Sequence, residues 1–164
     1  MLSATFERHD LALADAFTIA RGTRERAPVV TVQITDEGGQ TGVGAASPSA
    51  HYGETPDTVT AVLPDLFEAV EGVGDPHALD RIERRMRDRV RENPAARAAV
   101  SVALHDLAAK RLGVPCYRLW GLDPERAPRT SFTVGIDAPD RMREKAAAAV
   151  EAGHRVLKLK LGTD

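Results

Sequence analysis

The sequence predicts an α+β domain, built from a β-meander and helices, followed by the start of a (β/α) TIM-type barrel. Three observations predict this order. The first third has β-branched segments separated by turn residues, the middle has three helix starts marked by proline, and the end reads strand, helix, strand. With 43% hydrophobic and 28% charged residues among 164, the composition is that of an ordinary globular protein.

Charge and cysteine content exclude several classes of partner and site. A net charge of -2 gives no general attraction to nucleic acid or to an anionic membrane. The single cysteine, Cys116, excludes a disulfide framework within the chain and a cysteine-based metal site. No apolar run is long enough to span a bilayer, and the N-terminus carries charges where a signal peptide is apolar. We therefore expect a cytoplasmic protein with no nucleic-acid or membrane partner.

The β-meander is predicted from three segments. Residues 2–13 alternate imperfectly, and residues 28–35 are rich in β-branched side chains. Residues 36–39, Asp-Glu-Gly-Gly, supply a turn before the third segment at 41–45. Two connecting segments interrupt this meander, 17–26 and 47–55. Segments of this kind are usually plain connections, and the alternative is a pair of binding loops.

Three helices are predicted to begin where an oxygen-bearing residue precedes proline, at Thr55-Pro56, Asp75-Pro76 and Asn93-Pro94. The third helix has a stripe of small apolar residues at helical spacing, which predicts close packing on a neighbour. Gly113 is predicted to end it.

The last part of the chain predicts a βαβ unit. Residues 130–136 form the first strand, residues 139–152 an alanine-rich helix, and residues 155–161 the second strand. Such units nearly always make a parallel, right-handed pair. We therefore predict one domain over residues 1–125 and the first βαβ unit of a barrel over residues 126–164.

Alternation assigns the two faces of this unit. The apolar side chains are expected to face the helix: Phe132, Val134, Ile136, Leu157, Leu159 and Leu161. Ser131, Thr133, Lys158 and Lys160 then face the other way together. Because both faces of parallel sheets are normally buried, a shared polar face favours a barrel interior near the strand ends, where barrel enzymes place their chemistry. A complete barrel takes about 250 residues, so 164 residues contain little more than its first βαβ unit.

The two lysines of the last strand are chemically distinctive, because the chain has only four lysines among its 22 Lys and Arg residues. A lysine ammonium gives up its proton when desolvated, whereas a guanidinium does not, so lysine can act as a general base. The alternative is an edge strand with a solvated cationic face.

The succession of motifs resembles the enolase superfamily, in its mandelate racemase/muconate-lactonizing branch. It comprises the helix 98–110, the segments Gly113-Val114-Pro115 and Leu119-Trp120-Gly121, and the Lys-x-Lys strand. Within that branch, residues 130–137 and 157–162 look most like the dipeptide epimerases, typified by L-Ala-D/L-Glu epimerase. The resemblance implies that the first domain is a capping domain, and that the enzyme is a Mg²⁺-dependent racemase or epimerase abstracting the α-proton of a carboxylate, such as a dipeptide.

The resemblance also implies roles for individual residues. Lys160 is the catalytic base and Lys158 its electrostatic partner near the substrate carboxylate. Thr133 is a substrate contact. Arg21 binds a distal carboxylate of the substrate, and Arg24 is the competing candidate for that role.

Two departures from the family pattern stand out. Ala45 occupies a position where relatives commonly have glutamate. The metal-binding Asp, Glu and Asp of later strands have no counterpart, so no metal ligand is predicted within the 164 residues and the chain alone is expected to be inactive. Muconate cycloisomerase-like, o-succinylbenzoate synthase-like and non-catalytic folding or interaction modules are the alternatives. The expected partner is a small carboxylate substrate, and a homo-oligomer is possible.

Overall fold

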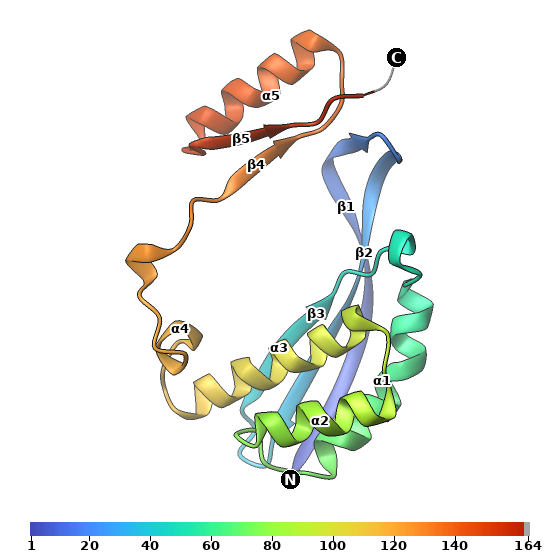
Figure 1. The fold of residues 1–164 in the computed structure, drawn as a ribbon, viewed down its shortest axis with the longest axis vertical. Coiled ribbons are helices and arrows are strands. Elements are labelled where there is room, and N and C mark those ends of the chain that lie inside the picture. The colour runs from blue at the N-terminus through green and yellow to red at the C-terminus, as the bar shows by residue number, and fades with distance from the viewer. Residues whose placement is uncertain (163–164) are drawn as a thin grey trace. The chain divides into compact units, whose positions relative to one another are not determined.

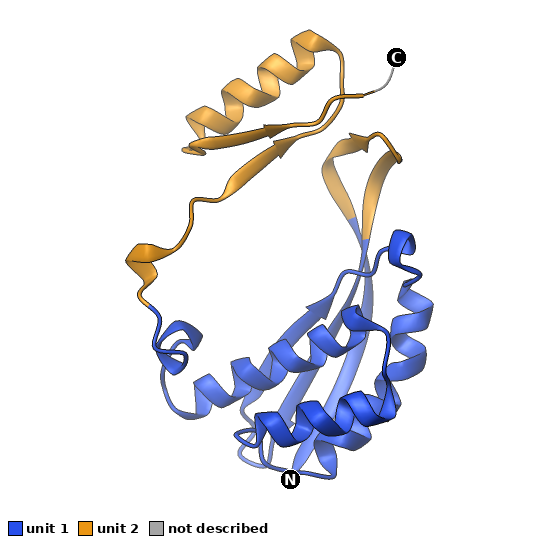
Figure 2. Cartoon of the chain, in the orientation of Figure 1, with its two compact units in different colours: residues 1–11, 28–122 blue, residues 12–27, 123–164 orange. Residues whose placement is uncertain are grey.

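The computed structural model describes residues 1–162 of the chain (Figure 1). These residues form two units, each with its own internal packing (Figure 2). Unit 1 contains residues 1–11 and 28–122, and unit 2 contains residues 12–27 and the chain from 123 onward. The predicted fold class is confirmed, with an antiparallel sheet and helices first and a βαβ unit after them. The predicted domain boundary at residue 125 stays a prediction.

The first sheet has three strands in the order β1 (Leu2–Ile19), β2 (Gly22–Asp36) and β3 (Thr41–Ala46). β2 and β3 are antiparallel, as the meander requires. Their turn is stabilised by the Asp36 carboxylate, which accepts hydrogen bonds from the backbone N–H groups of Gly38 and Gln40 at 2.9 and 3.0 Å.

The prediction that residues 17–26 form a connecting segment is wrong. β1 and β2 continue as a long hairpin, and only Ala20 and Arg21 lie between them. The end of this hairpin that belongs to unit 2, residues 12–27, is called the hairpin arm below. Gly22 has a φ of 132°, which an L side chain rarely adopts, and the hydroxyls of Thr18 and Thr23 are hydrogen-bonded at 2.9 Å. The Arg, Thr and Gly content that suggested a loop therefore belongs to paired strands and a tight turn.

Helix α1 (Pro56–Glu71) begins at the predicted residue. Thr55 caps it, and the side chains and backbone N–H groups of Thr55 and Thr58 are hydrogen-bonded reciprocally. Helix α2 (Leu79–Arg89) begins three residues later than predicted. Asp75 instead accepts a hydrogen bond from the His77 N–H at 2.9 Å, so Asp75-Pro76 forms a turn before the helix.

Helix α3 (Pro94–Arg111) lies against β3, and the three helices cover one face of the sheet (Figure 1). The close packing predicted for α3 depends on two glycines. A Cβ atom at Gly42 would overlap the carbonyl oxygen of Ala103, and one at Gly44 would overlap that of Ala99. The core of unit 1 lies between the helices and the sheet, and its largest buried side chains include Ile34, Leu63, Leu66, Ile82, Met86, Leu104 and Leu107.

Gly113 follows α3 with a φ of 66° and ends the helix as predicted. The short helix α4 (Cys116–Leu119) and a 3-10 turn, η2 (Pro124–Arg126), follow it. Within residues 1–162, none of the helices has the length and apolar character needed to cross a membrane.

The predicted βαβ unit is present in unit 2. β4 (Ser131–Val134) and β5 (Val156–Leu159) are parallel, and α5 (Pro139–Glu151) connects them. Val134 and Ala149 are buried, because α5 covers the strand from which Val134 projects.

Candidate functional site

The register of the parallel pair fixes which polar residues are neighbours. Thr133 is paired with Lys158, and Val134 with Leu159. The ladder continues past β5, because the Lys160 N–H donates to the Val134 carbonyl oxygen at 2.9 Å. Since side chains of paired residues project from the same side of a sheet, Thr133 and Lys158 share a face, and Lys160, two residues later, lies on that face too.

The opposite, apolar face is covered only in part. Val134 is buried, whereas Phe132 is 39% exposed, Leu159 53% and Leu161 82%. α5 therefore covers the end of β4 and leaves much of the apolar surface of the second strand open.

The hairpin arm meets the end of β4 inside unit 2. The Ile136 N–H donates to the Thr18 carbonyl oxygen at 2.9 Å. A Cβ atom at Gly135 would lie only 3.1 Å from that same oxygen, so the absence of a side chain at Gly135 allows the two backbones to approach.

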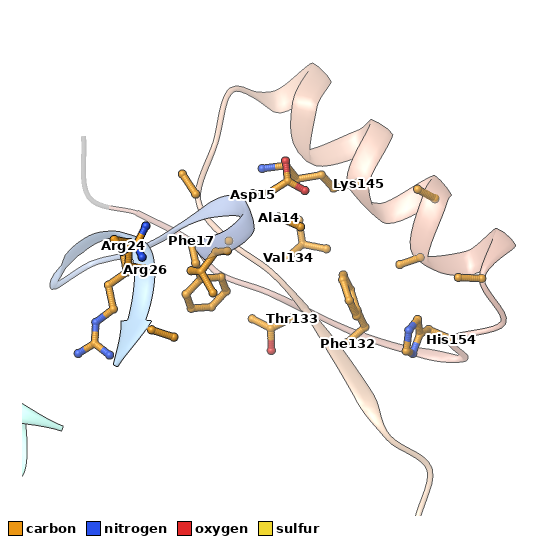
Figure 3. A pocket seen from close by; sticks show the side chains of 17 residues that line it. Ala14, Asp15, Phe17, Arg24, Arg26, Phe132, Thr133, Val134, Lys145 and His154 are labelled. Atoms are coloured by element: carbon orange, nitrogen blue, oxygen red, sulfur yellow. The ribbon is translucent and has the colours of Figure 1, made fainter. Parts of the chain in front are cut away.

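A cavity of about 650 Å³ lies where the arm, β4 and α5 come together. Figure 3 shows its labelled side chains. Phe17, Arg24 and Arg26 come from the arm, Phe132, Thr133 and Val134 from β4, and Lys145 from α5. Most of the remaining lining is alanine, so the cavity is a largely apolar space with cationic groups, the Asp15 carboxylate and the Thr133 hydroxyl on its wall (Figure 3).

Comparison with known proteins assigns the chain to a family. Residues 2–121 match the family model described as mandelate racemase / muconate lactonizing enzyme, N-terminal domain. The chain belongs to this family. The predicted resemblance to the mandelate racemase/muconate-lactonizing branch of the enolase superfamily, in its dipeptide epimerase group, is confirmed.

Three relatives illustrate the likeness. L-Ala-D/L-Glu epimerase from Bacteroides thetaiotaomicron is 40% identical over 163 residues, which is 99% of this chain and 42% of the relative. A crystal structure of dipeptide epimerase from Enterococcus faecalis, complexed with Mg and L-Leu-L-Tyr, has 31% identity and a TM-score of 0.89, covering 98% of this chain and 45% of that one. An enolase family member from Agrobacterium tumefaciens with homology to dipeptide epimerases, solved with bound sodium and L-Ala-L-Glu, has 34% identity and a TM-score of 0.79, covering 99% and 46%. The chain thus spans less than half the length of these relatives.

The structure brings some of the predicted site residues of this family member together and separates others. Arg24 and Thr133 line the same cavity. Lys158 is the strand partner of Thr133, and Lys160 follows it on the same face, but neither lysine is among the cavity-lining residues. Arg21 lies in the two-residue turn of the hairpin and does not line the cavity either.

An ion pair beside the cavity was not predicted from the sequence. Lys145 Nζ lies 2.9 Å from Asp137 Oδ2, and Asp137 Oδ1 accepts the Ala138 N–H at 2.9 Å. The hydrogen bond from Lys145 is the main reason that the pKa of the Asp137 carboxyl is lowered, and the Ala138 N–H adds to the effect. This ion pair joins the loop after β4 to α5. In the sequence, the acidic residue directly after the predicted strand 130–136, Asp137, is the feature that could have indicated this ion pair.

Three further residues, Phe17, Arg26 and His154, line the cavity and are not predicted from the sequence. The first two belong to segment 17–26, whose composition predicts a loop. His154 follows α5, and its ring lies 4.7 Å from that of Phe132, a contact that no sequence pattern indicated.

No group of three or more His, Cys, Asp or Glu side chains within residues 1–162 is arranged to hold a metal ion.

Proposed function

We propose that this chain is the N-terminal part of a Mg²⁺-dependent racemase or epimerase that abstracts the α-proton of a carboxylate substrate, most specifically a dipeptide. One observation carries the proposal. Thr133 and Lys158 are paired on the face of the βαβ unit that α5 does not cover, and Lys160 follows them at the carboxyl end of the strand. Barrel enzymes place catalytic groups at that end of their strands.

In this proposal Lys160 is the base that removes the α-proton. Lysine suits the role because its neutral amine can accept a proton, which a guanidinium cannot do at working pH. Lys158, two residues earlier on the same face, supplies a positive charge near the substrate carboxylate. Thr133 offers a hydroxyl beside Lys158 for a hydrogen bond to the substrate.

Mg²⁺ would stabilise the doubly charged enediolate that forms when the proton leaves. The Enterococcus relative was crystallised with Mg, which supports the same ion here. We expect its carboxylate ligands outside the 164 residues.

The proposed enzyme is expected to prefer a dipeptide substrate that carries an acidic side chain. Arg24 and Arg26 line one cavity together with a single acidic residue of the described chain, Asp15, and a guanidinium binds a carboxylate with paired hydrogen bonds. The Bacteroides relative, whose name includes L-Ala-D/L-Glu, supports this choice. The Enterococcus relative was crystallised with L-Leu-L-Tyr, so the test needs an apolar dipeptide beside the acidic one.

The test is α-proton exchange, followed by NMR in D₂O with Mg²⁺, on this chain together with the polypeptide that supplies the rest of the barrel. With L-Ala-L-Glu we expect deuterium at the α-carbon of the C-terminal residue and accumulation of the epimer. Exchange with muconate-type substrates in place of dipeptides would overturn the dipeptide assignment. Absence of exchange with every carboxylate would overturn the proposed chemistry and favour a non-catalytic module.

The proposal includes two further expectations that stay predictions. A cytoplasmic location is expected from the single cysteine and the N-terminal composition. A homo-oligomer is possible because exposed apolar surface is available on the βαβ unit.

A further inference from the structure

Glu54 has an unusual environment for a charged residue. It is 6% exposed, and it is the only buried polar or charged residue in the described part of the chain. A buried carboxylate is costly unless hydrogen bonds compensate for the lost water. The groups that compensate Glu54 therefore indicate what it does.

The Glu54 carboxylate accepts the backbone N–H of Ala95, at 2.9 Å from Oε1 and 3.2 Å from Oε2. Ala95 is the second residue of α3, whose first turn has N–H groups without helical partners. The residue before the helix, Asn93, makes no side-chain cap hydrogen bond and has a φ of 60°. Glu54 thus replaces the local cap from a position 41 residues earlier, and its negative charge suits the helix N-terminus.

Glu54 also ends a short turn segment, residues 49–55, together with Thr55. Before it lies the 3-10 turn η1 (Ala50–Tyr52), held by backbone hydrogen bonds from Tyr52 and Glu54 to Ser49 and from Gly53 to Ala50. After it, Thr55 caps α1. The carboxylate is therefore the tie between this segment and α3.

The segment presents two aromatic rings to solvent. The rings of His51 and Tyr52 are 5.0 Å apart in an edge-on arrangement, and Tyr52 is 77% exposed. Because these rings have few buried contacts, their position depends on the backbone that carries them.

We infer that Glu54 is a latch that fixes the conformation of residues 49–55, and with it the position of the His51 and Tyr52 rings, by capping α3 from a distance. The latch itself does not depend on the proposed function.

The test is hydrogen exchange of backbone amides, measured by NMR on the 164-residue chain. In Glu54→Ala, exchange at Tyr52, Gly53 and Ala95 should rise at least tenfold, while the interior of α1 keeps its protection. Glu54→Gln keeps a carbonyl acceptor without the charge, so it should give a smaller rise at the same amides. Contacts between the two rings, seen as nuclear Overhauser effects, should weaken in the same order.

Glu71→Gln is the matched control, because Glu71 accepts the Ala4 N–H at 3.3 Å and lies outside this segment. It should leave exchange at residues 49–55 unchanged. The latch is overturned if Glu54→Ala leaves exchange and ring contacts as in the unmodified chain. It is also overturned if exchange rises equally throughout α1 and α3, since Glu54 would then stabilise the unit without fixing the segment.

Discussion

Thr133 and Lys158 are partners across the parallel strands β4 and β5, so a hydroxyl and an ammonium group project from the same face of the βαβ unit. The hydrogen bond from the Lys160 N–H to the Val134 carbonyl oxygen extends this register by one step. The positions of both lysines are therefore set by backbone pairing, and substitutions of their side chains should leave the strands intact.

Replacing Lys160 tests the catalytic base. In the enzyme with a complete barrel, we expect Lys160→Arg to lower the α-proton exchange rate by about 10² to 10⁴, because arginine keeps its proton. Lys110→Arg is the control, since Lys110 pairs with Asp106 on α3 at 2.6 Å and an arginine can keep that ion pair. Near-normal exchange in Lys160→Arg would remove Lys160 from the role of base.

The two arginines of the hairpin are distinguished by the cavity. Arg24 lines it and Arg21 does not, so Arg24→Ala should raise KM for an acidic dipeptide about tenfold and change kcat less. Arg21→Ala should have the smaller effect on KM. Steady-state kinetics with acidic and apolar dipeptides measure both. The reverse order would restore Arg21 as the binder of the distal carboxylate.

The contact between β3 and α3 predicts a stability effect. Gly44→Ala places a methyl group on the Ala99 carbonyl oxygen. The methyl carbon is fixed to the backbone of β3 and the oxygen belongs to the backbone of α3, so neither can move away without shifting its strand or helix. We expect a loss of about 3 kcal/mol or more in the free energy of unfolding. Ala45→Ser, at the exposed neighbouring position, should change it by less than about 0.5 kcal/mol. Urea denaturation followed by circular dichroism compares the two.

The ion pair between Lys145 and Asp137 predicts a pH effect. The pKa of Asp137 is lowered in the folded chain, so its contribution to stability is present above the ordinary carboxyl pKa and is lost as pH falls through the lowered value. Lys145→Gln should move the Asp137 pKa back towards its ordinary value, as read from the carboxyl carbon shift in an NMR titration. Arg143→Gln, which removes the pair with Asp140 on the same helix, should leave it unchanged.

The exposed apolar side chains of the βαβ unit predict association. Phe132, Leu159 and Leu161 are all substantially exposed, so the 164-residue chain should elute with a mass that rises with concentration in size-exclusion chromatography with light scattering. Leu159→Glu should reduce this, whereas Leu112→Glu, at an exposed position after α3, should not. A single monomer mass at every concentration would contradict the prediction.

Features with strong local causes were predictable from the sequence. Thr55-Pro56 begins α1 because the cap and the proline are adjacent, and Gly113 ends α3 because a positive φ is needed there. The shared face of Thr133 and Lys158 followed from the two-residue period of strands.

Features made by distant residues were not predictable. The cap of α3 comes from Glu54, not from the adjacent Asn93. Arg24 and Thr133 line the same cavity because the hairpin arm contacts the end of β4. This contact includes the hydrogen bond from the Ile136 N–H to the Thr18 carbonyl oxygen. The hydrophobic pattern of a single segment does not indicate which distant residue will contact it.

The hairpin arm makes unit 2 discontinuous in sequence, since it needs residues 12–27 as well as the chain after residue 122. The arm is synthesised long before β4, so the Thr18 carbonyl oxygen has no partner until Ile136 has been synthesised as well. Bringing Thr18 and Ile136 together closes a long loop of chain and lowers its conformational entropy. This cost is offset only when the contacts between the arm and β4 form. A polypeptide that starts at residue 123 would therefore lack one wall of the cavity, however well its own strands pair.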